Sequence, residues 1–215
     1  MMTIKNIIFD FGGVLYDIDF SLMEKAFRDI GVRNIEQVSR QLTAERTFDH
    51  LETGAMSPDE FREQIRVTSG INFQDHQIDK AWNALLIGYQ NRRMQMLEQV
   101  KKHYRIFLLS NSNLIHFWKY QKELQEHYNM TTFDAIFEKP YFSFDIGYRK
   151  PKREAFDFVL KSSNLRPDET LFIDDTLEHI QGADKLGIKT KHLDLNAGEE
   201  VVNLFDGNGM LKVEF

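Results

Sequence analysis

The sequence predicts an α/β protein whose doubly wound, Rossmann-like parallel sheet carries an inserted all-helical cap domain. Short apolar runs bounded by polar loops alternate with helical patterns along most of the chain. This alternation is typical of strands that are buried on both faces of a parallel sheet. One long segment, 19–89, breaks the alternation because it shows helical patterns alone. We therefore expect the helical segment to be an insertion after the first strand.

The strands and helices of the core are predicted from apolar runs and from end signals. Apolar runs predict strands at 6–9, 105–109, 135–137, 170–173 and 189–193. Apolar periodicity predicts helices at 94–103, 114–128, 152–162 and 177–186. Pro151 lies just before the third of these helices and Gly187 just after the fourth, as is typical of helix starts and ends.

The inserted segment has a clear helix start of its own. Ser57-Pro58-Asp59-Glu60 forms a capping box with proline at the first helical position, which predicts a helix to about Thr68. An apolar stripe at 79–89 predicts another helix. We assign residues 1–16 and 93–215 to the α/β core and 17–92 to the cap.

Composition limits the classes of function. The chain has 215 residues, 42% of them hydrophobic and 28% charged, and a net charge of −6. A net negative chain gives no electrostatic reason to expect nucleic acid or an anionic membrane as a partner. The absence of cysteine excludes disulfides, thiolate catalysis and cysteine-ligated zinc. With no signal-peptide pattern or membrane-length apolar run, we expect a cytoplasmic protein. We also expect a monomer or weak homodimer, although no sequence pattern indicates the oligomeric state.

Polar residues just beyond the predicted strands are the candidates for a functional site. They are Asp10, Ser110, Asn111, Asp174 and Asp175. Ligands of open parallel sheets bind beyond the carboxyl ends of the strands, so we expect these side chains to converge. Lys150 joins them from the loop Gly147-Tyr148-Arg149-Lys150-Pro151.

This combination of residues suits phosphate chemistry assisted by a metal. Carboxylate oxygens and water are the ligands that Mg²⁺ prefers. The metal reduces the repulsion between an anionic phosphate and a carboxylate, which can then attack phosphorus and form an acyl phosphate. Lys150 would keep the nucleophile ionised and neutralise phosphate charge, while Ser110 would donate a hydrogen bond to a phosphoryl oxygen.

Four ordered segments resemble the motifs of the haloacid dehalogenase-like superfamily. They are Phe9-Asp10-Phe11-Gly12-Gly13-Val14-Leu15, Leu108-Leu109-Ser110-Asn111, Arg149-Lys150-Pro151 and Phe172-Ile173-Asp174-Asp175. Each lies at a predicted strand end or loop, which makes the ordered set far more specific than one motif. The resemblance implies a C1-type cap, with motifs most similar to α-D-glucose-1-phosphate phosphatase-like members.

The resemblance also implies a role for each motif residue. Asp10 is the nucleophile and a metal ligand, and Gly12 offers its backbone carbonyl to the metal. Asp175 is a direct metal ligand, and Asp174 a second one that acts through water. Ser110, the backbone N–H of Asn111 and Lys150 bind the phosphate, and Lys150 also takes part in catalysis. The implied reaction is Mg²⁺-dependent hydrolysis of a small phosphorylated metabolite, with a sugar phosphate favoured.

Position 12 departs from the usual phosphatase pattern. Gly12 stands where phosphatases of the superfamily usually carry a second aspartate, which protonates the leaving group and activates water. Glucose-1-phosphatase-like members share this glycine. Two alternatives remain open: a 2-haloacid dehalogenase-type hydrolase, which needs no metal, and a catalytically weak phosphate-binding module. Asp17 is a remote candidate for the missing acid.

Three further side chains are expected to have structural roles. His179 is predicted to lie on a helix surface without a catalytic role. Arg46 and Phe48 lie in the cap, where substrate contacts often arise, but packing is the expected role of both.

Overall fold

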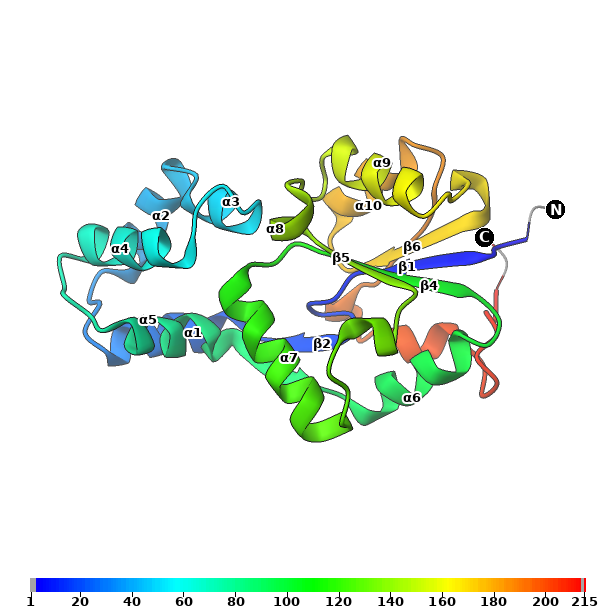
Figure 1. Cartoon of the computed structure of the whole chain (residues 1–215), viewed down its shortest axis with the longest axis horizontal. Helices are drawn as coiled ribbons and strands as arrows, with labels where there is room; N and C mark the ends of the chain where they lie inside the picture. The colour runs from blue at the N-terminus through cyan, green and yellow to red at the C-terminus, as the bar shows by residue number, and fades with distance from the viewer. Residues whose placement is uncertain (1–2, 214) are drawn as a thin grey trace.

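The computed structural model describes residues 3–213 and 215, and its centre is a parallel sheet (Figure 1). The strand order is β5-β4-β1-β6-β7, and every neighbouring pair is parallel. The strands are β1 (Asn6–Phe9), β4 (Arg105–Ser110), β5 (Lys139–Phe142), β6 (Thr170–Asp174) and β7 (Lys189–His192). The predicted doubly wound α/β core is therefore confirmed.

Helices cover both faces of this sheet (Figure 1). They are α6 (Asn91–Val100), α7 (Leu114–Tyr128), α8 (Ser143–Ile146), α9 (Arg153–Ser162) and α10 (Leu177–Asp184). Ile7 and Phe9 pack in one hydrophobic cluster with α6 and α7, whereas Ile8 packs in another with α9 and α10. Successive residues of a strand point to opposite faces, which explains why Ile7, Ile8 and Phe9 of β1 are all apolar. Single-turn 3₁₀ helices lie in the connections: η1 (Asn83–Leu85), η2 (Phe133–Ala135), η3 (Pro167–Glu169), η4 (Leu195–Ala197) and η5 (Val201–Leu204).

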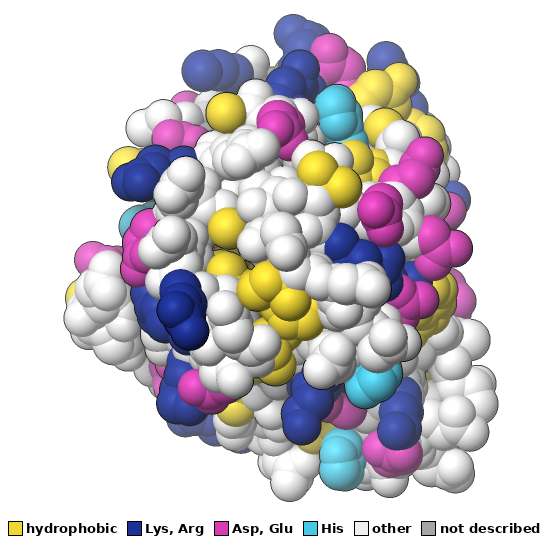
Figure 2. All heavy atoms as spheres, turned by 90° about the vertical axis from the view of Figure 1, so that its left-hand side faces the viewer, with side chains coloured by type: hydrophobic (Ala, Val, Ile, Leu, Met, Phe, Trp, Pro, Cys, Tyr) yellow, Lys and Arg dark blue, Asp and Glu magenta, His cyan; other side chains and the backbone are white. Residues whose placement is uncertain are grey.

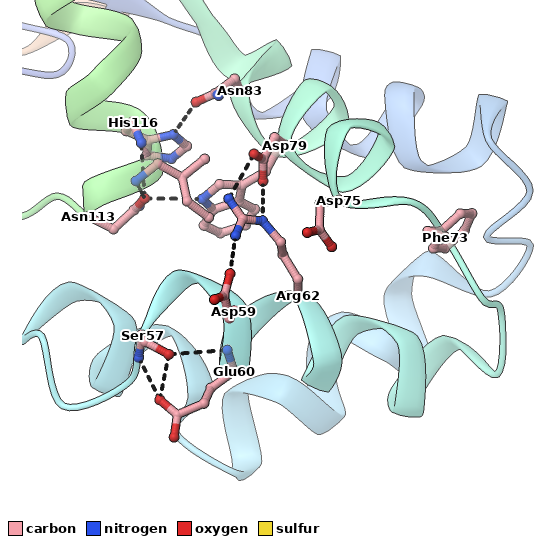
Figure 3. Close-up of polar contacts among 12 residues, drawn as sticks. Ser57, Asp59, Glu60, Arg62, Phe73, Asp75, Asp79, Asn83, Asn113 and His116 are labelled. Atoms are coloured by element: carbon pink, nitrogen blue, oxygen red, sulfur yellow. Dashed lines mark hydrogen bonds and ion pairs between the residues drawn. The ribbon is translucent and has the colours of Figure 1, made fainter.

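The inserted segment forms a separate group of helices beyond one end of the sheet (Figure 1). They are α1 (Phe20–Asp29), α2 (Ile35–Ala44), α3 (Thr47–Glu52), α4 (Pro58–Ser69) and α5 (Asp75–Trp82). These helices bury a hydrophobic cluster of their own, to which α7 contributes Ile115. The capping box at Ser57 and Glu60 is present at the start of α4 (Figure 3). We refer to this group as the cap and keep 17–92 as its proposed extent.

The surface at the cap end of the molecule carries charges of both signs (Figure 2). Acidic and basic side chains alternate there with hydrophobic ones, so neither sign of charge dominates this face. None of the helices described here is both long enough and apolar enough to cross a membrane.

Two short strands join the cap to the core, and this corrects the expectation that 19–89 is helical throughout. β2 (Tyr16–Ile18) pairs antiparallel with β3 (Leu86–Tyr89), so both connections run side by side. The apolar stripe at 79–89 is divided between the end of α5, the turn η1 and β3. A short apolar run fits a helix or a strand by periodicity alone, which explains the error.

The predicted strand at 135–137 is also wrong. Phe133–Ala135 is the 3₁₀ turn η2, and the fifth strand follows it as β5. Pro140 lies inside β5 and cannot donate to a sheet hydrogen bond, which argues against a strand from sequence alone. The strand is tolerated because β5 lies at an edge of the sheet.

The other differences are shifts of helix ends. α6 begins at Asn91 and ends at Val100, three residues before the predicted positions of 94 and 103. α10 ends at Asp184, and Gly187 follows in the left-handed conformation.

Candidate active site

Three carboxylates converge at the carboxyl end of the sheet. Phe9 of β1 pairs in register with Leu108 of β4 and Ile173 of β6. The residues that follow these three positions therefore lie at the same edge of the sheet. The backbone N–H of Asp10 donates to the carbonyl of Ile173, at 2.9 Å. Asp10, Asp174 and Asp175 each offer a carboxylate oxygen, and these oxygens lie within 4.8 Å of one another. An all-oxygen donor set of this kind fits Mg²⁺.

Lys150 lies fully buried among these carboxylates. Its ammonium group contacts Asp10 Oδ1 and donates to Asp174 Oδ2 at 2.7 Å. Burial raises the pKa of Asp10, and the negative charges of Asp174 and Asp175 add to this, although Lys150 opposes it. Burial alone would lower the pKa of Lys150, but its two carboxylate partners outweigh burial and raise it. Lys150 therefore stays cationic, whereas burial is the main reason that ionisation of Asp10 is disfavoured.

Asn111 orders the loop that carries Lys150. Its side-chain amide donates to the carbonyl of Lys150 at 2.9 Å and accepts from the Lys150 backbone N–H at 2.9 Å. The side chain of Asn111 is therefore occupied by the loop. Ser110 is buried at the end of β4 beside it, 3% exposed, as expected for a short hydroxyl at this edge.

The two glycines after Asp10 differ in what they require. At Gly13 the backbone has a φ of +82°, and a Cβ would lie 2.5 Å from Asp175 Oδ2, so a side chain cannot fit there. At Gly12 a Cβ would meet Ile18 Cδ1 at 3.1 Å, a close contact with the end of a flexible side chain. An apolar residue from β2 thus borders position 12, where the usual second aspartate is missing.

Two histidines contact the acidic pair Asp174-Asp175, and the sequence analysis predicted neither contact. His179 Nδ1 lies 3.0 Å and 3.1 Å from the two carboxylate oxygens of Asp174, so His179 lies beside the site and not on a free helix surface. Its expected lack of a catalytic role stays a prediction. His192 Nε2 donates to the carbonyl of Asp175 at 3.0 Å. His179 lies in the first turn of α10, only 5 residues after Asp174, and this short separation could have indicated the contact.

Asp17, the remote candidate for the missing acid, is paired with residues at the start of α6. Its carboxylate accepts hydrogen bonds from Arg93 Nη1 at 2.6 Å and from Gln90 Nε2 at 2.5 Å. This ion pair joins β2 to the start of α6, where the chain returns from the cap to the core. Asp17 is therefore part of the connection between the two parts of the protein.

One face of the cap contacts the core next to Lys150. Helices α3 and α8 lie against each other (Figure 1). Arg149, the residue before Lys150, contacts Asp49 Oδ1 and lies with its Nη2 3.0 Å from Glu52 Oε2. Gly54 follows α3, and a Cβ there would lie 2.4 Å from the backbone carbonyl of Phe144 in α8. The sequence indicated no contact of this kind.

A second contact between cap and core involves stacked aromatic rings. Trp82 stacks on Phe48 within the cap, with ring centroids 5.6 Å apart, and on His116 of α7, at 5.1 Å. His116 Nδ1 donates to Asn83 Oδ1 at 2.8 Å (Figure 3). Phe48 therefore has the expected packing role. Arg46 is exposed, with its guanidinium 3.4 Å from Asp49.

Comparisons with known proteins agree with this geometry. A family model described as "Hydrolase: haloacid dehalogenase-like hydrolase" matches residues 4–187. A D-ribitol-5-phosphate phosphatase from Bacteroides thetaiotaomicron is 33% identical over 188 residues, which cover 87% of this chain and 90% of the relative.

Solved structures show the same similarity. A crystal structure of a HAD family enzyme from Bacteroides thetaiotaomicron, in complex with magnesium and inorganic phosphate, has a TM-score of 0.84 and 35% identity, covering 94% of this chain and 100% of that one. A predicted HAD-like family hydrolase from Porphyromonas gingivalis has a TM-score of 0.79 and 31% identity, with coverage of 88% and 91%.

Proposed function

Because the chain belongs to the haloacid dehalogenase-like hydrolases, we propose that it is a Mg²⁺-dependent phosphatase that hydrolyses a small phosphomonoester, with a sugar phosphate favoured. The observation that carries the proposal is the convergence of Asp10, Asp174 and Asp175 around the buried Lys150. Two relatives support it: one is named a phosphatase of a polyol phosphate, and the other was solved with magnesium and inorganic phosphate.

The proposed metal ligands are the side chains of Asp10, Asp175 and Asp174, the last through water, and the backbone carbonyl of Gly12. When bound, Mg²⁺ would neutralise the charge that keeps a phosphate dianion away from these carboxylates. Lys150 and His179 both contact Asp174 and fix the position of its carboxylate.

The proposed reaction proceeds through an aspartyl-phosphate. A carboxylate oxygen of Asp10 forms a bond to phosphorus, and the bond between phosphorus and the ester oxygen breaks. Water then attacks the phosphorus, which releases inorganic phosphate and restores Asp10. Lys150 neutralises charge on the phosphoryl oxygens, while the Ser110 hydroxyl and the Asn111 backbone N–H donate to them.

The leaving alcohol must obtain its proton without a carboxylic acid at position 12. Ile18 borders that position, and Asp17 is held by Arg93, so we assign the proton to water or to the substrate itself. General acid–base catalysis is typically worth about 10²–10⁴-fold. Rates should therefore depend steeply on the pKa of the leaving alcohol across a series of aryl phosphates, and a flat dependence would show that another acid is present.

The acidic pair Asp174-Asp175 favours a phosphatase over a dehalogenase, whereas a non-catalytic module is separated from a phosphatase by turnover. A 2-haloacid dehalogenase also uses an aspartate nucleophile but needs no metal, so Asp174 and Asp175 would have no ligand to bind. A non-catalytic phosphate-binding module would bind Mg²⁺ and phosphate without turnover. Activity that is lost in EDTA distinguishes a phosphatase from a dehalogenase. Measurable hydrolysis of any phosphate distinguishes it from a non-catalytic module.

The central test is a panel of phosphorylated metabolites assayed with Mg²⁺ for wild type and Asp10→Asn. Loss of the nucleophile should lower kcat by at least about 10⁴-fold. Asp168→Asn, at the opposite end of β6, is the matched control and should keep full activity. An Asp10→Asn variant as active as wild type, or activity that survives EDTA, would overturn the proposal.

A further inference from the structure

The cap contains a cavity of about 260 Å³ within its own hydrophobic cluster, and we call it the cap cavity. Side chains from all five cap helices line it, among them the buried Phe27, Leu42, Ile65 and Trp82. Among the residues that the structure describes, none of those proposed for the phosphatase reaction lines this cavity. The cap cavity therefore needs an explanation of its own.

The cap cavity is large for a void in a folded protein, and its inner wall is apolar. Protein interiors have few voids larger than a water molecule, because each void removes packing contacts from the atoms that line it. Water needs polar partners, and the indole N–H of Trp82 already donates to Asn113 Oδ1 at 3.5 Å. An apolar molecule in the cavity would restore the missing contacts.

The volume of the cavity sets the size of its occupant. An apolar cavity of roughly 150 Å³ is large enough to bind benzene. By the same ratio, a cavity of about 260 Å³ holds roughly ten carbon atoms. The occupant is therefore a small molecule rather than a protein segment.

Charged side chains of both signs surround the mouth of the cap cavity. Glu24, Glu36, Ser39 and Arg40 line it and are exposed, so the cavity reaches the surface between α1 and α2. Both glutamates pair with Arg28, at 3.4 Å and 2.5 Å. An anionic head group would face these two carboxylates, and a cationic one would face Arg40 and compete with Arg28. The mouth therefore favours a ligand without charge.

We propose that the cap cavity binds a small uncharged apolar molecule of about ten carbon atoms, such as an aliphatic alcohol whose hydroxyl lies at the mouth. The inference goes beyond the proposed phosphatase function and does not depend on it. Trp82 lies between the cavity and the core, because its ring lines the cavity and stacks on His116 of α7 at 5.1 Å. Binding should therefore raise the Tm and change the fluorescence of Trp82.

The experiment is a titration of the full chain with nonan-1-ol and with nonanoate, which share a chain length and differ in charge. Calorimetry and tryptophan fluorescence measure binding; of the two tryptophans, Trp82 lines the cavity and Trp118 is half exposed on α7. We expect saturable binding of nonan-1-ol with a Kd of about 100 µM or tighter, as for an efficient ligand of about ten non-hydrogen atoms. Nonanoate should bind at least about tenfold more weakly, because its carboxylate would face Glu24 and Glu36.

Three variants locate the ligand. Val38 lines the cavity and is 9% exposed, so Val38→Phe occupies part of the space and should weaken binding of nonan-1-ol at least about tenfold. Val67→Phe makes the same change at a 65% exposed position of α4 outside the cavity and should bind as wild type. Asp10→Asn should also bind as wild type, because Asp10 does not line the cavity. Should Val38→Phe fail to fold, as judged by circular dichroism, Ser39→Phe at the exposed mouth takes its place.

Three results would overturn the inference. If nonan-1-ol does not bind at any concentration up to its solubility limit, the cavity is only a packing void. Equal binding by wild type and the cavity-filling variant would place the ligand elsewhere on the protein. Nonanoate binding as tight as that of nonan-1-ol would refute the assignment to an uncharged ligand. Each of these results leaves the phosphatase proposal intact, since turnover of phosphates tests that proposal separately.

Discussion

Replacing His116 with glutamine is expected to remove a large part of the protein's sensitivity to acid. His116 is 7% exposed and stacks on Trp82 at the contact between the cap and α7. Burial lowers its pKa to about 3, and the neighbouring charge of Lys119 adds to the effect. The folded protein therefore keeps His116 neutral, with Nδ1 donating to Asn83 (Figure 3).

The sign of the effect follows from proton binding. In the unfolded chain His116 titrates at about 6.5, whereas in the folded protein it takes up a proton only near pH 3. The unfolded state therefore binds more protons in this window, and the free energy of unfolding rises with pH. The contribution is fully present above pH 6.5 and is lost as the pH falls below it.

The magnitude follows from the two pKa values. At 1.36 kcal/mol for each pKa unit, a fall from 6.5 to about 3 limits the contribution to at most about 5 kcal/mol over the whole window. Between pH 7 and pH 5, where protonation of the unfolded state is the main change, the free energy of unfolding should fall by about 2 kcal/mol because of His116.

Urea unfolding followed by circular dichroism at pH 7 and pH 5 measures this difference. Glutamine does not titrate and can still donate to Asn83, so the difference between the two pH values should shrink by about 2 kcal/mol in His116→Gln. His127→Gln, at an exposed position of the same helix, is the matched control and should behave as wild type. If His116→Gln keeps the wild-type difference between pH 7 and pH 5, the buried neutral histidine is not the source of acid sensitivity.

Two further predictions concern the cap and the acidic pair. Arg62 is 8% exposed and makes a bidentate ion pair with Asp79, with both contacts at 2.9 Å. Asp79→Ala leaves this buried charge with less compensation, so it should lower the free energy of unfolding by about 3 kcal/mol in urea titrations. Asp59→Ala, which removes the exposed partner of Arg62, should cost less than about 1 kcal/mol, and equal losses would contradict the reasoning. His179→Ala removes a hydrogen-bond partner of Asp174 and should weaken Mg²⁺ binding at least about tenfold. The measurement is the dependence of Tm on Mg²⁺ concentration, and an unchanged dependence would show that His179 does not support the metal site.

The sequence alone determined the core of the fold and the motif residues of the candidate site. Apolar runs identified β1, β4 and β6, because strands that helices cover on both faces of a sheet are mostly apolar. The ends of such strands meet at one edge of a parallel sheet, so the convergence of Asp10 with Asp174 followed from their place in the chain. Ser57 and Glu60 fixed the start of α4 because a capping box is a local interaction.

Only the tertiary structure decided what lies against these residues. Glu52 and Arg149 are distant in sequence, and their contact depends on how the cap rests on the core, which no local pattern records. His179 showed the pattern of a helix surface, but the first turn of α10 brings it to Asp174. β5 is a short strand at an edge of the main sheet, and β3 is a short strand that pairs only with β2. The conformation of both depends on their pairing partners rather than on their own residues. Motifs and buried strands are set by local chemistry, whereas contacts between segments distant in the sequence are set by packing in three dimensions.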